Sequence, residues 1–314
     1  MRAPFSSRGA RRMRVAAALL VLCGGAATLA AATVAAPVHS TGISGYSSKQ
    51  GVICTFCHSG GVAPTVRLVG PTFVLHDSTV RYTFTVSGGQ VVAAGLDVAI
   101  DDNAGTLAAT DTGTHIDNSE VTHDTPRLVD SNGDAIFFFD YTAPSTPMSV
   151  AMYAAGNSVN LNGSNSGDNA RSKQIKIVVV DNLTSFLKFG VATAGSGGIL
   201  PTVQTVDGPS VGPWSITINN VLGGASGFLW VGFAMKDQLA FGGHFYIDLS
   251  SPYFLAPIAF GGTPGLAGDG SLTIPGVDVS SYAPLTLFLQ GTMIDAGAPK
   301  GVSMTKGIQM DVQN

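Results

Sequence analysis

VRYTFTV, the stretch from Val80 to Val86, decides the fold class because apolar side chains alternate with arginine and threonine along it. In an extended strand successive side chains point to opposite faces, so Val80, Tyr82, Phe84 and Val86 share one face. Similar runs lie around it, separated by turn clusters such as DDNAG, DSNGD and NGSNSGD: VRLVG, GLDVAI, AIFFFDYTAP, MSVAMYAAG and KQIKIVVV. This pattern predicts an antiparallel β-sandwich over residues 65–181.

Residues 182–314 contain a second set of short strand patterns. The runs are separated by Gly- and Pro-rich turns: GFLWVGFAM, GHFYIDLS, GSLTIPGVDV, APLTLFLQGTMID and SMTKGIQMDV. Such a series again indicates a sandwich. The expected fold class is therefore all-β with two β-sandwich domains, and Asn182-Leu183 marks the expected junction between them.

Composition bounds the function. Charged residues make up 11% of the chain, while Gly numbers 40 and Pro 16, a profile that suits an extracellular all-β protein. The net charge is −4 and no basic cluster follows the leader, which argues against nucleic acid or an anionic membrane surface as partner. After the leader no apolar run approaches the roughly 18 to 20 residues needed to span a bilayer, so no transmembrane anchor is expected in the mature chain.

The N-terminus reads as a signal peptide over residues 1–36. Five arginines precede the apolar run VAAALLVLCGGAATLAAATVAA, which ends in small residues: Arg2, Arg8, Arg11, Arg12 and Arg14. Cleavage is expected between Ala32 and Ala36. Cys23 follows Leu22, which is too large for the small residue that precedes a lipidated cysteine. We therefore expect an exported protein without a lipid anchor, in the periplasm, at the cell surface or outside the cell.

CTFCH, residues 54–58, carries the clearest chemical motif. Two thiols three positions apart followed by a histidine form the c-type haem attachment pattern, in which Cys54 and Cys57 add to vinyl groups and the His58 imidazole binds iron. Outside the leader these are the only cysteines. One covalent haem c is predicted. A redox disulfide and half of a zinc site are the alternatives, but no βαβ setting accompanies the first and no second ligand pair completes the other.

Residues 37–64 form the arm that carries this motif. The segment is rich in Gly and Ser and too short to build a core of its own. We therefore expect the porphyrin to lie between the arm and the sandwich that follows.

The sandwich strings resemble a known fold and group. The order of GLDVAI, SEVTHDTP, FFFDYTAP, VAMYAAGNSVNLNG and SGDNA resembles the reeler-type sandwich, an immunoglobulin-like fold. With GISGYSSKQGVICTFCHSGG before it, the chain from residue 42 to 181 resembles a group of exported bacterial proteins of myxobacterial type, in which a CxxCH arm precedes such a sandwich. Residues 182–314 resemble a β-domain that recurs in exported planctomycete and myxobacterial proteins, here without its frequent cysteine pair.

The second axial ligand is the open question of such an iron site. His123, in SEVTHDTP, is the candidate distal ligand, because the resembling proteins carry a histidine in that string; the alternative is a structural hydrogen-bonding residue. The remaining histidines are weaker candidates: His39, His76, His115 and His244. Met148 and Met152 lie on one strand and offer thioethers, although methionine in an apolar strand usually packs in a core. An open sixth position would instead permit peroxidase or gas-sensing chemistry.

Clusters of oxygen-bearing side chains suggest a weaker calcium hypothesis. One cluster is Asp97, Asp101, Asp102 and Asn103, and the other is the stretch NLNGSNSGD at 160–168. Neither follows a calcium-loop spacing, and tight turns use the same residues. No GxSxG, HExxH or phosphate-loop motif is present.

The leading functional hypothesis is an exported monohaem c-type cytochrome-like protein that transfers single electrons outside the cytoplasmic membrane to an unidentified redox partner. The alternative is a cell-surface or extracellular β-sandwich binding or adhesion protein in which haem is structural or sensory. Tyr153, Tyr246 and Tyr253 are its candidate glycan-stacking residues. Either way we expect an electron carrier or a binding protein rather than an enzyme.

Overall fold

The predicted all-β, β-sandwich fold class is confirmed. The computed structural model describes residues 41–89 and 92–314, so the expected signal peptide and His39 lie outside the described part. The described residues form strands and four short 3₁₀ helices, η1 (Cys54–Phe56), η2 (Ser196–Gly198), η3 (Ser280–Tyr282) and η4 (Pro299–Gly301). None of the helices in these two ranges is long and apolar enough to cross a bilayer.

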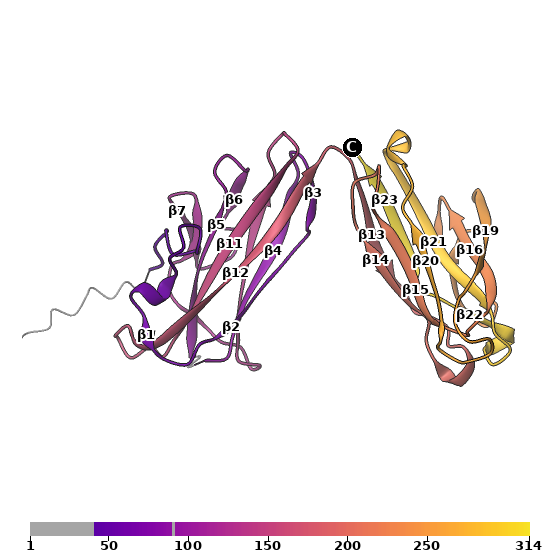
Figure 1. Cartoon of the computed structure of the whole chain (residues 1–314), viewed down its shortest axis with the longest axis horizontal. Coiled ribbons are helices and arrows are strands. Elements are labelled where there is room, and N and C mark those ends of the chain that lie inside the picture. The colour runs from indigo at the N-terminus through magenta and orange to yellow at the C-terminus, as the bar shows by residue number, and fades with distance from the viewer. Residues whose placement is uncertain (1–40, 90–91) are drawn as a thin grey trace, which may run out of the picture. The chain divides into compact units, whose positions relative to one another are not determined.

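The first sandwich consists of two sheets, coloured indigo to magenta in Figure 1. The large sheet has the order β1 (Ser59–Gly60), β12 (Ser166–Val180), β11 (Met148–Val159), β5 (Ala93–Ile100), β8 (Glu120–His123), β7 (Thr114–Asp117). Beside this path, β3 (Phe73–Leu75) pairs with β12, and β9 (Arg127–Leu128) pairs with β5. The small sheet has the order β2 (Thr65–Val69), β4 (Thr79–Ser87), β10 (Asp134–Thr142), β6 (Thr106–Ala108).

The alternation along VRYTFTV sets the core of this sandwich. In the β4–β10 register Phe84 lies opposite Phe137 and Tyr82 opposite Phe139, and all four side chains are fully buried. They pack against apolar side chains of the large sheet: Leu96, Val98, Met152, Ile177 and Val179. The face predicted for Tyr82, Phe84 and Val86 is therefore the core face.

Strand β5 is unusual because both of its faces are buried. All eight residues from Ala93 to Ile100 are buried, although antiparallel sheets commonly leave one face to water. Leu96 and Val98 face the core, and the alternation puts Gly95 and Asp97 on the other face. Residues 42–47 of the arm and the ring of His123 cover that outer face.

The second sandwich is built from residues 183–313. Its main sheet has the order β13 (Leu183–Phe189), β23 (Gly307–Gln313), β21 (Leu285–Ile294), β16 (Ser226–Gly232), β19 (Tyr253–Ala259), with β22 (Val302–Met304) beside β21. A smaller sheet has the order β14 (Thr202–Val206), β15 (Ser215–Val221), β20 (Gly270–Pro275), and β17 (Met235–Ala240) pairs with β18 (Gly243–Ile247). Trp214, Ile218 and Ile308 are among its core residues. Among the described residues no strand pairing crosses Asn182.

Neighbouring phenylalanines on β10 test this register. Phe137 is fully buried, whereas Phe138 is 41% exposed on the opposite face. Phe137→Ala should lower the free energy of unfolding of the first sandwich by about 3 to 5 kcal/mol, because it leaves a cavity. Phe138→Ala should cost less than about 1 kcal/mol. Chemical denaturation of the full chain measures both, and equal losses would contradict the register.

Candidate functional site

One tight turn carries the two thiols and the imidazole of CTFCH. The backbone N–H groups of Cys57 and His58 both donate to the Cys54 carbonyl, at 3.2 and 3.0 Å. The turn therefore closes on itself over η1. Cys57 is exposed, Cys54 is half-buried, and both are free thiols. Cys54, Cys57 and His58, the three predicted haem-attachment residues, therefore share one hydrogen-bonded turn.

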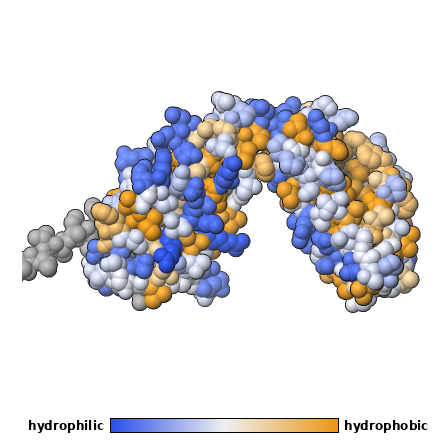
Figure 2. Space-filling model, in the orientation of Figure 1, coloured by the Kyte–Doolittle hydropathy of each residue, from blue (hydrophilic) through white to orange (hydrophobic). Residues whose placement is uncertain are grey.

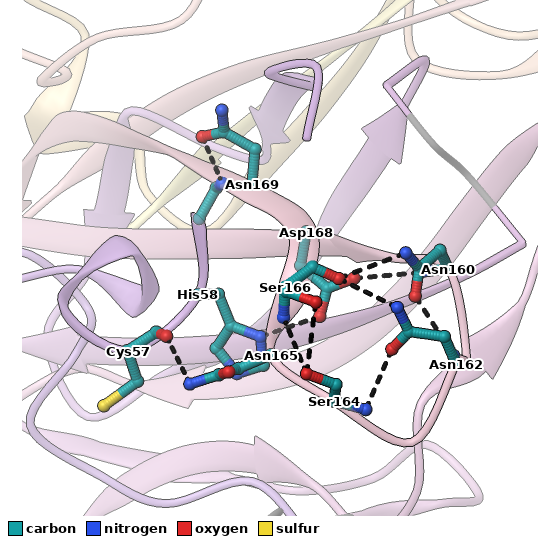
Figure 3. A network of polar contacts seen from close by, with 10 residues as sticks. Cys57, His58, Asn160, Asn162, Ser164, Asn165, Ser166, Asp168 and Asn169 are labelled. Carbon is teal, nitrogen blue, oxygen red and sulfur yellow. Dashed lines mark hydrogen bonds and ion pairs between the residues drawn. The ribbon is translucent and has the colours of Figure 1, made fainter. Parts of the chain in front are cut away.

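The segment after the motif is fixed to the sandwich by backbone and amide contacts (Figure 3). Asn165 donates from Nδ2 to the Cys57 carbonyl at 2.6 Å and accepts from the Ser59 N–H at 3.1 Å. Strand β1 then pairs in parallel with β12, and Asn169 donates to the Gly61 carbonyl at 2.7 Å. The motif is therefore held against the end of β12.

The His58 imidazole is oriented by a buried carboxylate. Its Nδ1 lies 2.9 Å from Oδ2 of Asp168, which is 2% exposed and whose Oδ1 accepts the Asn160 N–H at 3.0 Å. A carboxylate can only accept, so in the neutral ring this contact places the proton on Nδ1 and the free electron pair on Nε2. Carboxylates orient metal-binding histidines in this way. No described residue hydrogen-bonds to that Nε2.

The loop that carries Asn165 and Asp168 is stabilised by its own side chains (Figure 3). Asn160 Oδ1 accepts the Asn162 N–H at 3.0 Å, and Asn162 Oδ1 accepts the Ser164 N–H at 2.8 Å. Both amides also donate to the Ser166 carbonyl. The oxygens considered for calcium thus shape the turn that presents Asp168.

The second oxygen cluster is likewise engaged within the protein. Asp101 accepts from the Ala151 N–H at 2.7 Å and from the Tyr153 hydroxyl at 3.2 Å, and Asp102 pairs with Lys49 at 2.5 Å. Within residues 41–89 and 92–314, no three or more His, Cys, Asp or Glu side chains are arranged to hold a metal ion.

Before the motif, three consecutive backbone N–H groups of the arm each donate to a carboxylate of the large sheet. Ser44 donates to Asp117 at 2.9 Å, Gly45 to Glu120 at 2.9 Å, and Tyr46 to Asp97 at 2.7 Å: one carboxylate each from β7, β8 and β5. The arm therefore lies directly on the sheet.

These contacts bear on where a porphyrin would lie at the motif. The inner side of the arm is occupied by its own hydrogen bonds to the sheet, and η1 contacts β11 and β12. The side of the turn that remains free carries the exposed Cys57 and Phe56, whose ring is 74% exposed. The arm backbone is thus satisfied by the sandwich carboxylates, and the outer side of the turn is open to a bound group.

His123 contacts the same arm. A Cβ at Gly95 would lie 2.3 Å from His123 Cε1, and one at Gly42 would lie 2.6 Å from its Nδ1, so both glycines make room for the ring. Nδ1 lies 3.2 Å from both the N and the O of Leu96. Burial lowers the pKa of His123, and the contact with the Leu96 backbone partly opposes this shift. His123 on β8 therefore lies against the arm at Gly42, while His58 belongs to the arm itself.

The other ligand candidates have separate structural contacts. His76 Nδ1 lies 2.8 Å from Asp77, His115 Nε2 lies 3.0 Å from the Thr122 hydroxyl, and His244 Nδ1 lies 2.8 Å from Asp237. Met152 is fully buried in the core between the two sheets, with Met148 packed against that core. Met152 is thus a core residue.

The thiol environment bears on the disulfide alternative. Burial raises the pKa of Cys54 to about 12, and the negative charge of Asp97 adds to the effect. Redox-active CxxC motifs instead depend on a cysteine whose pKa is lowered. The surroundings of Cys54 therefore disfavour that thiol as the nucleophile.

Four carboxylates of this site lay outside the haem interpretation of the sequence. Asp97 and Asp168 entered only as calcium candidates, and Asp117 and Glu120 were not singled out. All four lie in or beside strings that carry the family resemblance, GLDVAI, SEVTHDTP and SGDNA. The occurrence of these strings together with the CTFCH arm was the sequence signal that could have pointed to the four carboxylates.

Comparison with known proteins adds little. No protein-family model matches the chain, and no curated protein sequence matches it. Similar solved structures include native alpha-2-macroglobulin from Escherichia coli, 17% identical over 56% of this chain and 24% of that one, with a TM-score of 0.25. Salmonella alpha-2-macroglobulin reacted with methylamine is 13% identical over 77% and 16%, with a TM-score of 0.21. This chain thus spans a quarter or less of either structure, and similarity this low supports no argument about function.

A double-mutant cycle tests the docking of His123. Gly95→Ala alone should destabilise the first sandwich by about 1 to 3 kcal/mol, because the new methyl group overlaps the imidazole. In a His123→Ala background the overlap disappears, and the same change should cost much less. Chemical denaturation measures the four free energies of unfolding. Additive costs would show that the ring lies elsewhere.

Proposed function

We propose that the chain is an exported monohaem c-type cytochrome-like protein that transfers single electrons outside the cytoplasmic membrane. One observation carries the proposal: the buried Asp168 carboxylate holds Nδ1 of His58 at 2.9 Å and leaves Nε2 free, beside two unpaired thiols on the same turn. Free thiols, a fixed imidazole tautomer and an oriented ring are what covalent haem attachment requires of a CxxCH segment.

Each residue has a defined part in this proposal. Cys54 and Cys57 would hold the group through thioether bonds, and His58 would bind the iron through Nε2. Asp168 would keep that ring in its orientation and strengthen its electron donation. Haem bound there supplies reversible one-electron chemistry at its iron.

The exposure of the turn favours electron transfer. Cys57 and Phe56 lie at the surface, so a group attached there is open to a protein partner, as exchange of electrons requires. His123 stays in the proposal as the distal ligand, supported by its contact with the arm at Gly42.

A mass measurement tests attachment. Protein purified from a host with haem-attachment machinery should be red and heavier than the bare chain by one haem, and the colour should survive a denaturing gel. The Cys54→Ser, Cys57→Ser double variant should be colourless under the same conditions. A colourless wild-type protein with two titratable thiols would remove the cytochrome proposal.

Optical spectra test His123. If its imidazole is the sixth ligand, His123→Ala should convert a low-spin spectrum into a high-spin one, because the position loses its strong nitrogen ligand. The matched control is His115→Ala, since His115 already bonds Thr122. A low-spin spectrum that persists in His123→Ala would dismiss this ligand and leave attachment at His58 untouched.

The second sandwich favours a second candidate function, surface binding. Apolar side chains lie exposed along its edge strand β19, where Tyr253, Phe254 and Leu255 are 42%, 51% and 44% exposed, and apolar residues reach the surface in Figure 2. Tyr246, by contrast, is 3% exposed and accepts the Val191 N–H with its hydroxyl, so it is a core residue. Loss of ligand binding in a Tyr253→Ala variant of a colourless protein would support this candidate.

A further inference from the structure

Two of the three carboxylates that anchor the arm lie together on the outer face of the large sheet. Asp97 on β5 is paired with Thr122 on β8, and Glu120 lies two residues from Thr122, on the same face. This diagonal placement brings the two carboxyl groups within reach of each other, and burial together with the neighbouring Glu120 raises the pKa of Asp97. Consecutive arm residues bond to them, Gly45 to Glu120 and Tyr46 to Asp97.

Both carboxyl groups are withdrawn from water. Asp97 is 2% exposed and Glu120 is 8% exposed. One Asp97 oxygen accepts the Tyr46 N–H, while its other oxygen, Oδ1, is buried and has no donor among the described residues. Two ionised carboxylates have no proton to share and repel each other, so a contact of this kind requires one proton between them.

Among residues 41–89 and 92–314, no hydrogen bond or ion pair joins a cationic side chain to Asp97 or Glu120. Two other titratable groups lie nearby, and neither is a cation. Asp117 on β7 adds to the raised pKa of Asp97, and burial raises the pKa of Cys54 on the arm. Lys49 on the arm bonds to Asp102. His115 bonds to Thr122, and His123 lies against the backbone of Leu96.

We propose that Asp97 and Glu120 share one proton and that this proton latches residues 42–47 onto the large sheet, so that rising pH releases the arm. The latch depends on the sandwich and the arm alone, and it operates with or without a group attached to Cys54 and Cys57.

The direction of the pH dependence follows from the buried pair. Burial, and next the contact with Glu120, raise the pKa of Asp97 above its ordinary value. The docked arm therefore binds a proton that the released arm gives up, and docking weakens as pH rises from the ordinary aspartate range toward the raised value. A difference of one proton changes the opening equilibrium by about tenfold per pH unit.

Hydrogen exchange measured by mass spectrometry on the full chain tests the latch. After correction for intrinsic exchange rates, the opening equilibrium of residues 42–47 should rise by up to about tenfold per unit between about pH 6 and pH 8 in the wild type. Residues 79–87 of β4 are the internal reference and should not follow. In Asp97→Asn the dependence should vanish, because the amide still accepts the Tyr46 N–H and donates to Glu120 but cannot ionise.

Asp117→Asn is the matched control. Asp117 anchors the neighbouring N–H, and its hydrogen bond from Ser44 lowers its pKa, so it is ionised throughout this range. This variant should shift the level of exchange and keep its slope, while Glu120→Gln should flatten the slope as Asp97→Asn does. A flat wild-type profile, or a slope that survives in Asp97→Asn, would overturn the latch. Should Asp97→Asn fail to fold, the slope in the wild type and its loss in Glu120→Gln decide whether the latch exists. The same slope measured in colourless protein, which carries no haem, separates this result from the haem proposal.

Discussion

The structure of the first sandwich depends on hydrogen bonds between the backbone of the arm and the carboxylates of the large sheet. A glycine- and serine-rich segment has little apolar surface to bury, so it needs another means of fixing its backbone. Ser44, Gly45 and Tyr46 find one in Asp117, Glu120 and Asp97. Hydrogen bonds to charged or partly charged groups contribute more than neutral ones. These contacts bury the outer face of β5 and give the strand its second buried side.

The motif lies between two such anchors. Residues 42–47 fix the chain before CTFCH, and the pairing of β1 with β12 fixes it afterwards. Because both flanks are attached to one rigid sandwich, the turn over Cys54 needs no core of its own. His58 gains its orientation from Asp168, more than 100 residues further along the chain. The sandwich thus acts as the scaffold on which a short arm becomes an ordered site.

The sequence allowed the sandwich and the motif to be predicted, but not the contact between them. The alternation from Val80 to Val86 and the CTFCH motif can both be recognised in the sequence, because each pattern lies within a few consecutive residues. The bond from Tyr46 to Asp97 or from His58 to Asp168 joins segments distant in sequence and follows no spacing rule. Asp97 and Asp168 could therefore be recognised as polar, but not as anchors. The direct docking of the arm on the sheet could not be predicted for the same reason.

Because both faces of strand β5 are buried, the first sandwich cannot be truncated or fused at residue 64 without exposing part of that strand. Residues 65–181 contain every strand of the two sheets except β1, yet without residues 42–47 they would present Asp97 to water. A gene fusion that joined this sandwich to another leader near residue 64 would therefore yield a domain with an uncovered face. Recombination and evolution alike should treat arm and sandwich as one inseparable unit.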